Sequence, residues 1–448
     1  MKLDYHTKNK LIKFSLLSLI VLNLFIIISL WWANSGYYVR NPSNGNGLIA
    51  LGRIFGLLGA YTLIIQIMLV SRTKWIEGVF GFDKLNKLHR LIGYSILILL
   101  LNHPLFLIIG YANTNQVSYV TQLSEFLTNW NGVLYAFFGL ITFILIISIS
   151  IAIVRKRLRY ETWYFVHLLT YLSLALVFKH QVQTADVSFG VGLYYWYFLN
   201  IFAIGNLLLY RFLRPLYLFK KHHFVVDKVV EETPDTWSLY VTGKNLDKFY
   251  FNAGQYANIN ILAKKMWYTH PFSFSSAYNG KFIRFTIKGL GDYTNKISGV
   301  AKGTRIVIDG PLGLFIRERA QKNKFLFIAG GIGITPIRAM IELISTTQSN
   351  DMILLFGSRT EKDIAFKKEF DKILEHCQTF KITYILSTQI AGYESGYIDK
   401  EKIIRLVPDF LEREVFLCGP PVMMQKTALN LKEMGFDTKY LHFEKFSF

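Results

Sequence analysis

The chain has 448 residues, of which 52% are hydrophobic and 18% are charged, and its formal net charge is +20. This length predicts roughly two to four domains of ordinary size. A high apolar content and a charge fraction below the roughly 25% of soluble domains exclude a disordered chain. Two cysteines, Cys377 and Cys418, are too few for a disulfide scaffold.

Apolar residues are concentrated in the first half, in stretches long enough to cross a bilayer, which takes about 20 residues. The first stretch could instead be a signal peptide, because lysines precede it, but its apolar core is longer than the ~15 residues of such signals and more spans follow. We therefore predict an all-α six-helix membrane domain over residues 1–220. The expected spans are residues 14–33, 48–70, 88–111, 130–154, 163–180 and 191–212.

The positive charges alternate between loops. Lys and Arg are abundant in the N-terminal segment, in the second and fourth loops and after the last span, and they are sparse in the other loops. Because cytoplasmic loops carry such charges, both termini are expected in the cytoplasm. The basic excess is then mainly an orientation signal and does not indicate nucleic-acid binding. We expect an integral protein of the plasma membrane, in contact with the lipid bilayer and without an obligatory protein partner.

The pattern changes to short alternating runs after about residue 221. Gly, Asn and Asp separate these runs, which predicts an antiparallel β-barrel over residues 221–318. Over residues 319–448, apolar strands alternate with amphipathic helices, which predicts a Rossmann-like α/β domain with a parallel sheet. The expected barrel strands are residues 224–230, 237–242, 256–261, 282–287 and 305–308.

Four histidines interrupt the apolar spans, His89 and His103 in the third and His167 and His180 in the fifth. Ionisable groups at membrane depth are costly and indicate function. The third and fifth spans run in the same direction, so each pair shares a level, and the two levels lie about 20 Å apart. Neutral imidazole is a natural axial ligand of haem iron. The pattern predicts two bis-histidine haems, stacked across the membrane.

Helical angle tests this pairing. At about 100° per residue, the third-span histidines lie within about 40° of one face, whereas the fifth-span histidines miss by about 140°. The fifth span therefore needs a bulge, kink or looser turn between His167 and His180. The alternative is four polar side chains that bond between helices or reach the interfaces.

Arg53 begins the second span on the outer side, near the level of His103. It is either an interfacial arginine that reaches lipid headgroups or a positive charge beside the outer haem, where an electron acceptor or an anion would sit.

Two motifs in the β-rich region suit a flavin nucleotide. Residues 270–276 read His-Pro-Phe-Ser-Phe-Ser-Ser, and an aromatic ring and hydroxyls in a rigid turn can flank and bond an isoalloxazine. Residues 310–315 read Gly-Pro-Leu-Gly-Leu-Phe, and their glycines let backbone amides approach a pyrophosphate. Residues 291–294, Gly-Asp-Tyr-Thr, could add contacts.

Two further motifs suit a dinucleotide. Residues 325–336 predict a strand, a glycine turn and a helix with Pro336 near its first position, whose N-terminus favours phosphate. The turn departs from the usual GxGxxG and is weak evidence by itself. Residues 418–421, Cys-Gly-Pro-Pro, end a strand, where ligands bind in parallel sheets. An ordinary Gly/Pro turn explains one such motif, but not four in this order.

HPFSFSS, GPLG, AGGIGITP and CGPP, in that order, resemble the ferredoxin-NADP reductase superfamily. With the six spans and their histidines, the chain resembles the NADPH oxidase and ferric reductase family over roughly residues 10–448. The resemblance implies that FAD is held by His270, Pro271, Phe272 and Ser273, with Ser276 and Gly313 nearby. It implies that a nicotinamide nucleotide is held by Gly330, Gly331, Gly333, Thr335, Cys418, Gly419 and Pro420.

The resemblance also implies further roles. Arg359 is placed to meet a 2′-phosphate, which favours NADPH over NADH, although a solvated loop arginine explains it equally well. Phe446, or alternatively Phe448, would shield the flavin until nicotinamide displaces it. Arg53 matches an arginine near the outer haem, and Arg53, Phe446 and Cys418 are expected at the reacting centres.

The sequence departs from the family at two places. Ser173 stands where the oxidases often carry an aromatic between the fifth-span histidines, which leaves the route between the haems open. Leu107 replaces a further histidine, which weakens the case for dedicated superoxide production. We see no calcium-binding loops and no long N-terminal regulatory extension, and therefore expect activity without calcium control.

Together these patterns predict an NAD(P)H oxidoreductase that moves electrons from cytoplasmic NADPH through FAD and two b-type haems to an external acceptor. Oxygen, giving superoxide, is the first expectation from the resemblance, and ferric iron is the alternative. The sequence leaves two further alternatives: a haem-free flavin reductase tethered to the membrane, and a redox sensor or electron-entry subunit that feeds a partner.

Overall fold

The structure, a computed structural model, describes residues 5–151, 160–183, 186–266, 268–347 and 350–443. The basic residues of the fourth-to-fifth loop, and Phe446 and Phe448, lie outside the described residues. The chain forms two compact units. The helical unit comprises residues 9–80 and 84–211, and the sheet unit is formed mainly by residues 212–448.

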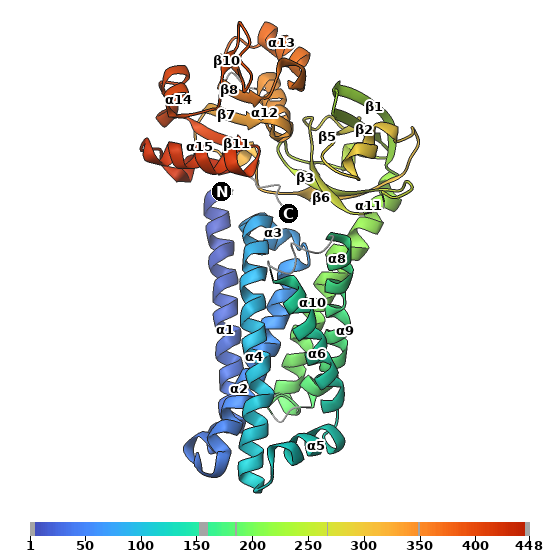
Figure 1. The fold of residues 1–448 in the computed structure, drawn as a ribbon, viewed down its shortest axis with the longest axis vertical. Coiled ribbons are helices and arrows are strands. Elements are labelled where there is room, and N and C mark those ends of the chain that lie inside the picture. Colours follow the sequence, from blue (N-terminus) through green and yellow to red (C-terminus); the bar gives the residue numbers. More distant parts are fainter. Residues whose placement is uncertain (1–4, 152–159, 184–185, 267, 348–349, 444–448) are drawn as a thin grey trace. The chain divides into compact units, whose positions relative to one another are not determined.

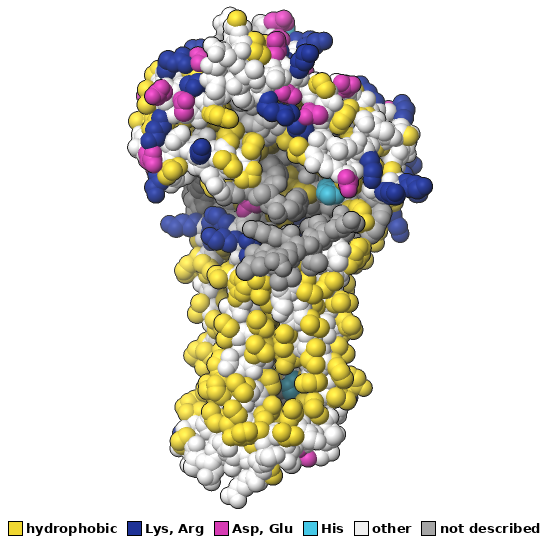
Figure 2. Space-filling view, in the orientation of Figure 1, with side chains coloured by type: hydrophobic (Ala, Val, Ile, Leu, Met, Phe, Trp, Pro, Cys, Tyr) yellow, Lys and Arg dark blue, Asp and Glu magenta, His cyan; other side chains and the backbone are white. Residues whose placement is uncertain are grey.

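The helical unit is a bundle of long apolar helices that run side by side (Figure 1). Six helical stretches among the described residues are long and apolar enough to span a membrane, which confirms the predicted number. Large apolar side chains cover the visible face of this unit, as expected for a surface that faces lipid (Figure 2). Its long helices are α1 (Tyr5–Arg40), α2 (Asn46–Val70), α4 (Phe82–Asn115), α6 (Val133–Ser150), α8 (Tyr160–Leu168) with α9 (Thr170–Val182), and α10 (Gly190–Leu207).

Two short helices of this unit, α3 (Lys74–Phe80) and α5 (Tyr119–Asn129), were not expected from the sequence. The hydroxyl of Ser118 caps α5 by accepting from the backbone amide of Thr121.

The fifth span contains the required irregularity. Helix α8 ends at Leu168 and α9 begins at Thr170, so that Leu169 separates them. The amide of Leu169 donates to the carbonyl of Val166 at 3.1 Å, a three-residue spacing that marks a tight turn. This interruption falls between His167 and His180, where the sequence requires an irregularity.

Helices α6 and α9 approach closely at a glycine. A Cβ atom at Gly139 would lie 2.6 Å from the Cγ1 of Val177 and 3.3 Å from the carbonyl oxygen of Ser173. Any side chain there would push α9 away from α6. Gly139 thus helps to set the position of the span that carries His167 and His180.

The first part of the sheet unit is an antiparallel barrel of two three-stranded sheets, as predicted. Isolated bridges join the sheets at Phe274 and Phe285 and at Val225 and Arg305. Residues 270–273, which we expected in a rigid turn, form a strand instead because they pair with the central strand of the second sheet. The sheets are β1 (Val225–Thr233), β2 (Thr236–Thr242), β5 (Ile283–Lys288), and β4 (His270–Ser273), β3 (Tyr256–Ile261), β6 (Ile306–Leu312).

The second part is an α/β domain with a six-stranded parallel sheet in the order β10-β9-β8-β7-β11-β12, which confirms the predicted class. Its strands are β7 (Lys324–Gly330), β8 (Asp351–Ser358), β9 (Phe380–Leu386), β10 (Glu394–Ser395), β11 (Glu414–Cys418) and β12 (Leu441–Phe443). Its helices are α12 (Ile334–Thr347), α13 (Lys367–His376), α14 (Lys400–Leu406) and α15 (Pro421–Glu433). The sequence did not predict β10, β12 or α14, and α12 begins two residues before Pro336.

A buried charge network joins the barrel to the α/β domain. Arg284 of β5 is 3% exposed and pairs with Glu369 of α13 at 2.8 Å. Arg338 of α12 donates from Nε to the same carboxylate at 2.8 Å, and from Nη1 to the carbonyl of Ser275 at 2.9 Å. Burial alone would raise the pKa of Glu369, but its bonds to both guanidiniums outweigh it and keep the pKa below its usual value. The network therefore links β5 and the segment that follows β4 in the barrel to α12 and α13.

Replacing Glu369 with Gln should destabilise the sheet unit by about 1–3 kcal/mol at pH 7, because buried Arg284 loses its carboxylate partner and buried Arg338 keeps only Glu342. A carboxyl whose pKa is lowered by folding stabilises fully above its unfolded value of about 4.3, and the contribution is lost as the pH falls through the folded value. Thermal unfolding temperatures of wild type and Glu369→Gln should therefore differ at neutral pH and converge in acid. Equal temperatures at pH 7 would show that the network contributes nothing.

Candidate functional site

The outer histidines form a close pair. The ring centroids of His103 on α4 and His180 on α9 lie 5.9 Å apart. The Nδ1 of His103 lies 2.8 Å from the carbonyl oxygen of Gly52, which can only accept, so Nδ1 carries the proton and Nε2 keeps its lone pair. A Cβ at Gly56 would lie 2.5 Å from this Nδ1, so the glycine leaves the space that the ring needs.

The inner histidines form a second pair, with ring centroids of His89 and His167 6.1 Å apart. The hydroxyl of Ser150 donates to Ile146 at 2.7 Å and has the Nδ1 of His167 at 3.2 Å. Since its one proton is used, Ser150 accepts from Nδ1, and the Nε2 of His167 is again the free acceptor. Trp163 stacks on the His167 ring at 5.1 Å and fixes its plane.

Both pairs suit two axial ligands on one metal. An imidazole nitrogen binds a metal at about 2 Å, so rings on opposite sides of one ion have centroids about 6 Å apart. Among the described residues, no group of three or more His, Cys, Asp or Glu side chains could hold a metal ion. Sets of two histidines are what a haem takes from the protein, because its own nitrogens occupy the other positions. The residues present therefore fit two haems.

An apolar layer separates the two histidine pairs. Ile96 of α4 and Leu174 of α9 each lie between the two histidines of their span; Ile96 forms an apolar cluster with Leu63 of α2 and Phe143 of α6, and Leu174 packs against this cluster. Ser173 is fully buried, and its hydroxyl donates to the carbonyl of Leu169, the residue just before its helix. Sequence reasoning sought an aromatic on the fifth span alone. The ring of Phe143 comes from a neighbouring helix, which only the packing reveals.

Arg53 is part of an ion pair that the sequence did not reveal. Its Nε and Nη2 donate to the two carboxylate oxygens of Asp186 at 2.9 and 2.7 Å. Asp186 lies six residues after His180, in the connection to α10, and no motif marks it. Arg53 follows Gly52 on α2, and the carbonyl of Gly52 accepts a hydrogen bond from His103. This part of α2 therefore lies beside the outer histidine pair. The expected isolated positive charge is therefore matched by a carboxylate.

The two flavin motifs lie on either side of one strand. Strand β3 pairs with β4 and β6, so that Ser273 and Leu312 both stand opposite Tyr256. Gly313 directly follows β6 with a φ of 95°, a left-handed conformation that favours glycine. Residues His270, Pro271, Phe272 and Ser273 are thus brought to the same end of a small sheet as Gly313.

Aromatic rings and a free hydroxyl mark this end of the sheet. Tyr293, from residues 291–294, lies 4.0 Å from the His270 ring by centroids and is nearly parallel to the ring of Phe272. The Oγ of Ser276 is buried and has no hydrogen-bond partner among the described residues. A buried hydroxyl of this kind fits a polar group of a bound nucleotide. The residues present therefore fit a flavin nucleotide.

The two dinucleotide motifs touch each other at the carboxyl ends of β7 and β11. A Cβ at Gly333 would lie 2.4 Å from the carbonyl oxygen of Cys418, and a Cβ at Gly419 would lie 3.1 Å from the amide nitrogen of Gly330. Because these glycines have no side chain, the backbone after β7 can pack directly against the backbone after β11. Gly331 has a φ of 51° and nothing within 4 Å of a Cβ position, so it serves the turn itself.

Three further residues were predicted to bind the nicotinamide nucleotide: Thr335, Arg359 and Pro420. Thr335 is buried at the start of α12, where its hydroxyl donates to Ile332 at 3.0 Å. Arg359 follows β8, is 70% exposed, and has carboxylates of Asp235 and Asp363 at 3.5 and 3.7 Å. Pro420 precedes the first residue of α15.

The end of the described chain lies beside Cys418. Strand β12 pairs with β11 so that Phe443, the last described residue, stands opposite Leu417. His442 is held by a 2.5 Å contact with the buried Glu414. The pairing of β12 with β11 therefore places the last described residue beside the end of β11, where the Cys-Gly-Pro-Pro motif begins.

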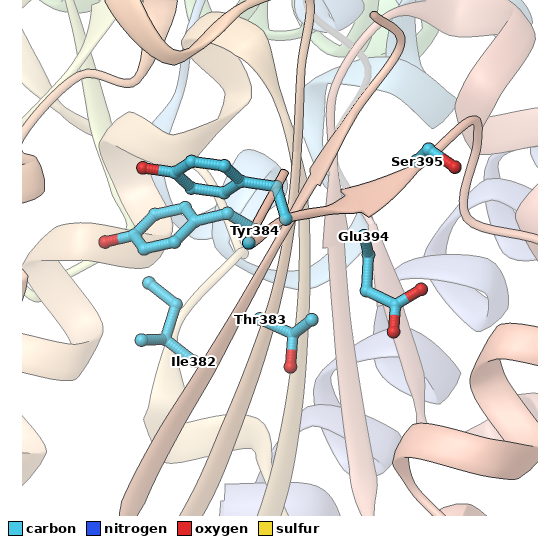
Figure 3. A pocket seen from close by; sticks show the side chains of 7 residues that line it. Ile382, Thr383, Tyr384, Glu394 and Ser395 are labelled. Carbon is cyan, nitrogen blue, oxygen red and sulfur yellow. The ribbon is translucent and has the colours of Figure 1, made fainter. Parts of the chain in front are cut away.

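A separate open pocket of about 480 Å³ lies on β9 and β10 (Figure 3). Its lining includes Tyr384 of β9, Glu394 and Ser395 of β10, and Tyr393 just before β10. In the strand order, β9 and β10 are separated from β7 and β11 by β8. The pocket is therefore distinct from the meeting point of the glycine motifs.

Comparison with protein families gives three matches in chain order. Residues 55–178 match the ferric reductase like transmembrane component, and residues 223–315 match an FAD-binding domain. Residues 327–428 match the oxidoreductase NAD-binding domain. The chain is therefore an integral membrane protein and an NAD(P)H-dependent oxidoreductase with FAD- and NAD(P)H-binding domains.

Curated relatives share about half of the chain or less. The glycine betaine monooxygenase reductase subunit of Pseudomonas aeruginosa is 29% identical over 49% of this chain, and the chain spans 62% of its length. NADH-cytochrome b5 reductase 1 of Dictyostelium discoideum is 32% identical over 33% of this chain and 53% of its own length.

Solved structures show weaker likeness. The cytochrome P450 reductase GcoB of Amycolatopsis has a TM-score of 0.46 and 23% identity, covering 50% of this chain and 68% of its own. The FAD/NAD-binding domain of a Vibrio cholerae nitric oxide dioxygenase has a TM-score of 0.45 and 21% identity, covering 49% of this chain and 96% of its own.

Substituting Gly333 with Ala should weaken nicotinamide nucleotide binding, because the new Cβ would overlap the carbonyl of Cys418 and separate the two turns. Overpacking of this kind costs about 1–3 kcal/mol, which is roughly a tenfold or larger loss of affinity. The measurement is the KM for NADPH and NADH with ferricyanide as acceptor. Gly299→Ala is the matched control, since a Cβ there has no heavy atom within 4 Å. Equal KM values in both variants would contradict the account.

Proposed function

Because the chain has the domain architecture of the NADPH oxidase and ferric reductase family, we propose that it transfers electrons from cytoplasmic NADPH to an acceptor outside the cell. The observation that carries the proposal is the presence of two close histidine pairs, at two levels of the same two spans. The proposed domains are residues 1–220 for haem, 221–318 for FAD and 319–448 for the nicotinamide nucleotide.

Bound FAD and two b-type haems would supply the redox chemistry, which is hydride acceptance followed by one-electron transfer. The protein's share is ligation, spacing and orientation. His89 and His167 hold the inner haem, and His103 and His180 hold the outer one. For two of the four ligands, neighbouring groups fix the ring: Gly52 bonds His103, Ser150 bonds His167 and Trp163 stacks on His167.

The sheet unit would bind the donor and the flavin. His270, Pro271, Phe272 and Ser273 line the flavin site, and the free hydroxyl of Ser276 bonds the nucleotide. The close approach of Gly333 to Cys418 would bring the two glycine turns together around the nicotinamide nucleotide, and exposed Arg359 would meet the 2′-phosphate of NADPH. Phe446 or Phe448 covers the flavin until nicotinamide arrives, and the register of β12 beside β11 supports this role.

The alternation of basic loops supports a plasma-membrane protein with both termini in the cytoplasm. The donor would then bind inside, and His103, His180 and Arg53 would face outward. Oxygen, reduced to superoxide, is the proposed acceptor. Ferric iron is the second candidate, favoured by the match of residues 55–178 to a ferric reductase like component and by Leu107, which packs against Gly52.

Replacing His103 or His180 with Ala should remove the outer haem, because one imidazole alone leaves a ligand position open. We expect haem content in the pyridine haemochrome assay to fall by about half, while NADPH-driven ferricyanide reduction by the flavin persists. Asn102→Ala is the matched control, since its amide bonds only to Ile98 in its own helix among the described residues. Unchanged haem content in both histidine variants would overturn the assignment, and a haem-free wild type would favour a tethered flavin reductase.

A further inference from the structure

Arg53 and Asp186 form a buried, electrically neutral pair. Arg53 is 11% exposed and Asp186 3%, and both carboxylate oxygens accept from the guanidinium. The hydroxyl of Ser35 on α1 donates to the same carboxylate at 3.4 Å, and Tyr38 lies 5.7 Å from the guanidinium carbon. Burial and two bonds hold the pair together, so its two charges cancel in place.

Two connections along the chain place the Arg53–Asp186 pair near the outer histidines. Arg53 directly follows Gly52, whose carbonyl accepts from His103, and Asp186 is six residues beyond His180, in the connection from α9 to α10. In a low-dielectric surrounding an uncancelled charge acts strongly over such distances. Whether this pair is neutral therefore decides the electrostatic potential where electrons leave the helical unit.

We propose that Asp186 determines the specificity for the acceptor, by cancelling the charge of Arg53 and thereby favouring a neutral acceptor, dioxygen, over anionic ferric chelates. The proposal rests on the proposed function. An uncancelled arginine would concentrate anions at the exit. It would also retain the product, because one electron added to dioxygen gives the superoxide anion. A neutral pair admits dioxygen and releases its product.

The position of Asp186 indicates a role beyond attaching α1 to α2. Neutral hydrogen-bonding or apolar side chains could join these helices without a buried carboxylate, which is costly to desolvate. Here the carboxylate is matched to Arg53, whose neighbour Gly52 accepts from the outer histidine His103, and it pairs through both of its oxygens.

The test compares acceptors in the purified holoenzyme. Asp186→Asn keeps the shape of the side chain and leaves Arg53 uncancelled. We expect the ratio of kcat/KM for ferric-EDTA to that for dioxygen to rise about tenfold. In a potentiometric titration, the midpoint of the outer haem should move to a more positive value while the inner one stays. Asp186→Glu keeps the charge and should restore wild-type behaviour in both measurements.

Matched variants separate this local effect from net charge and from folding. Glu125→Gln on α5 makes the same charge change at an exposed carboxylate, where salt screens it, and should leave the ratio unchanged. Arg53→Met with Asp186→Leu removes both charges and should keep the wild-type ratio. If Asp186→Asn does not bind haem, Tyr38→Lys adds a positive charge beside the intact pair and must raise the ratio instead.

The outcomes distinguish this proposal from the proposed function. A ratio and an outer midpoint that are the same in Asp186→Asn and wild type would overturn the role of Asp186, as would an equal rise in Glu125→Gln. A wild type that reduces neither dioxygen nor ferric-EDTA would instead contradict the proposed function itself.

Discussion

The two imidazole pairs lie at levels about 20 Å apart on the same two membrane spans. At both levels, each span must therefore direct a histidine toward the other span. A regular helix satisfies this over the 14 residues from His89 to His103, but not over the 13 from His167 to His180. The tight turn at Leu169 interrupts the fifth span within this interval, and Gly139 and Gly56 leave room for the neighbouring helix and for the ring of His103. The helical unit is thus shaped by where four side chains must meet.

The sheet unit follows a comparable constraint, in which backbone must come close to backbone. Gly333 and Gly419 let the turns after β7 and β11 touch, and β3 places the two flavin motifs on its two sides. Arg284, Arg338 and Glu369 then hold barrel and α/β domain in one arrangement. Charges that are buried and fully paired define an orientation more sharply than apolar contact does.

Periodicity and motif order predicted the six spans, the barrel and the parallel sheet, because each leaves a repeating signal in the chain. The histidine pairs could also be anticipated, since span direction and residue spacing place them. Asp186 and Phe143 could not, because their partners lie on other helices and no local pattern records the contact. Residues 270–273 were taken for a turn because Pro271 and the serines resemble one, whereas pairing with β3 makes them a strand.

The most direct test of the account is an anaerobic reduced-minus-oxidised spectrum of the purified, FAD-loaded protein after addition of NADPH. The account predicts b-type haem bands that correspond to two haems per chain and that appear with NADPH as the only reductant. Absence of haem bands, or haems that dithionite reduces and NADPH does not, would contradict electron transfer from the sheet unit through the paired histidines.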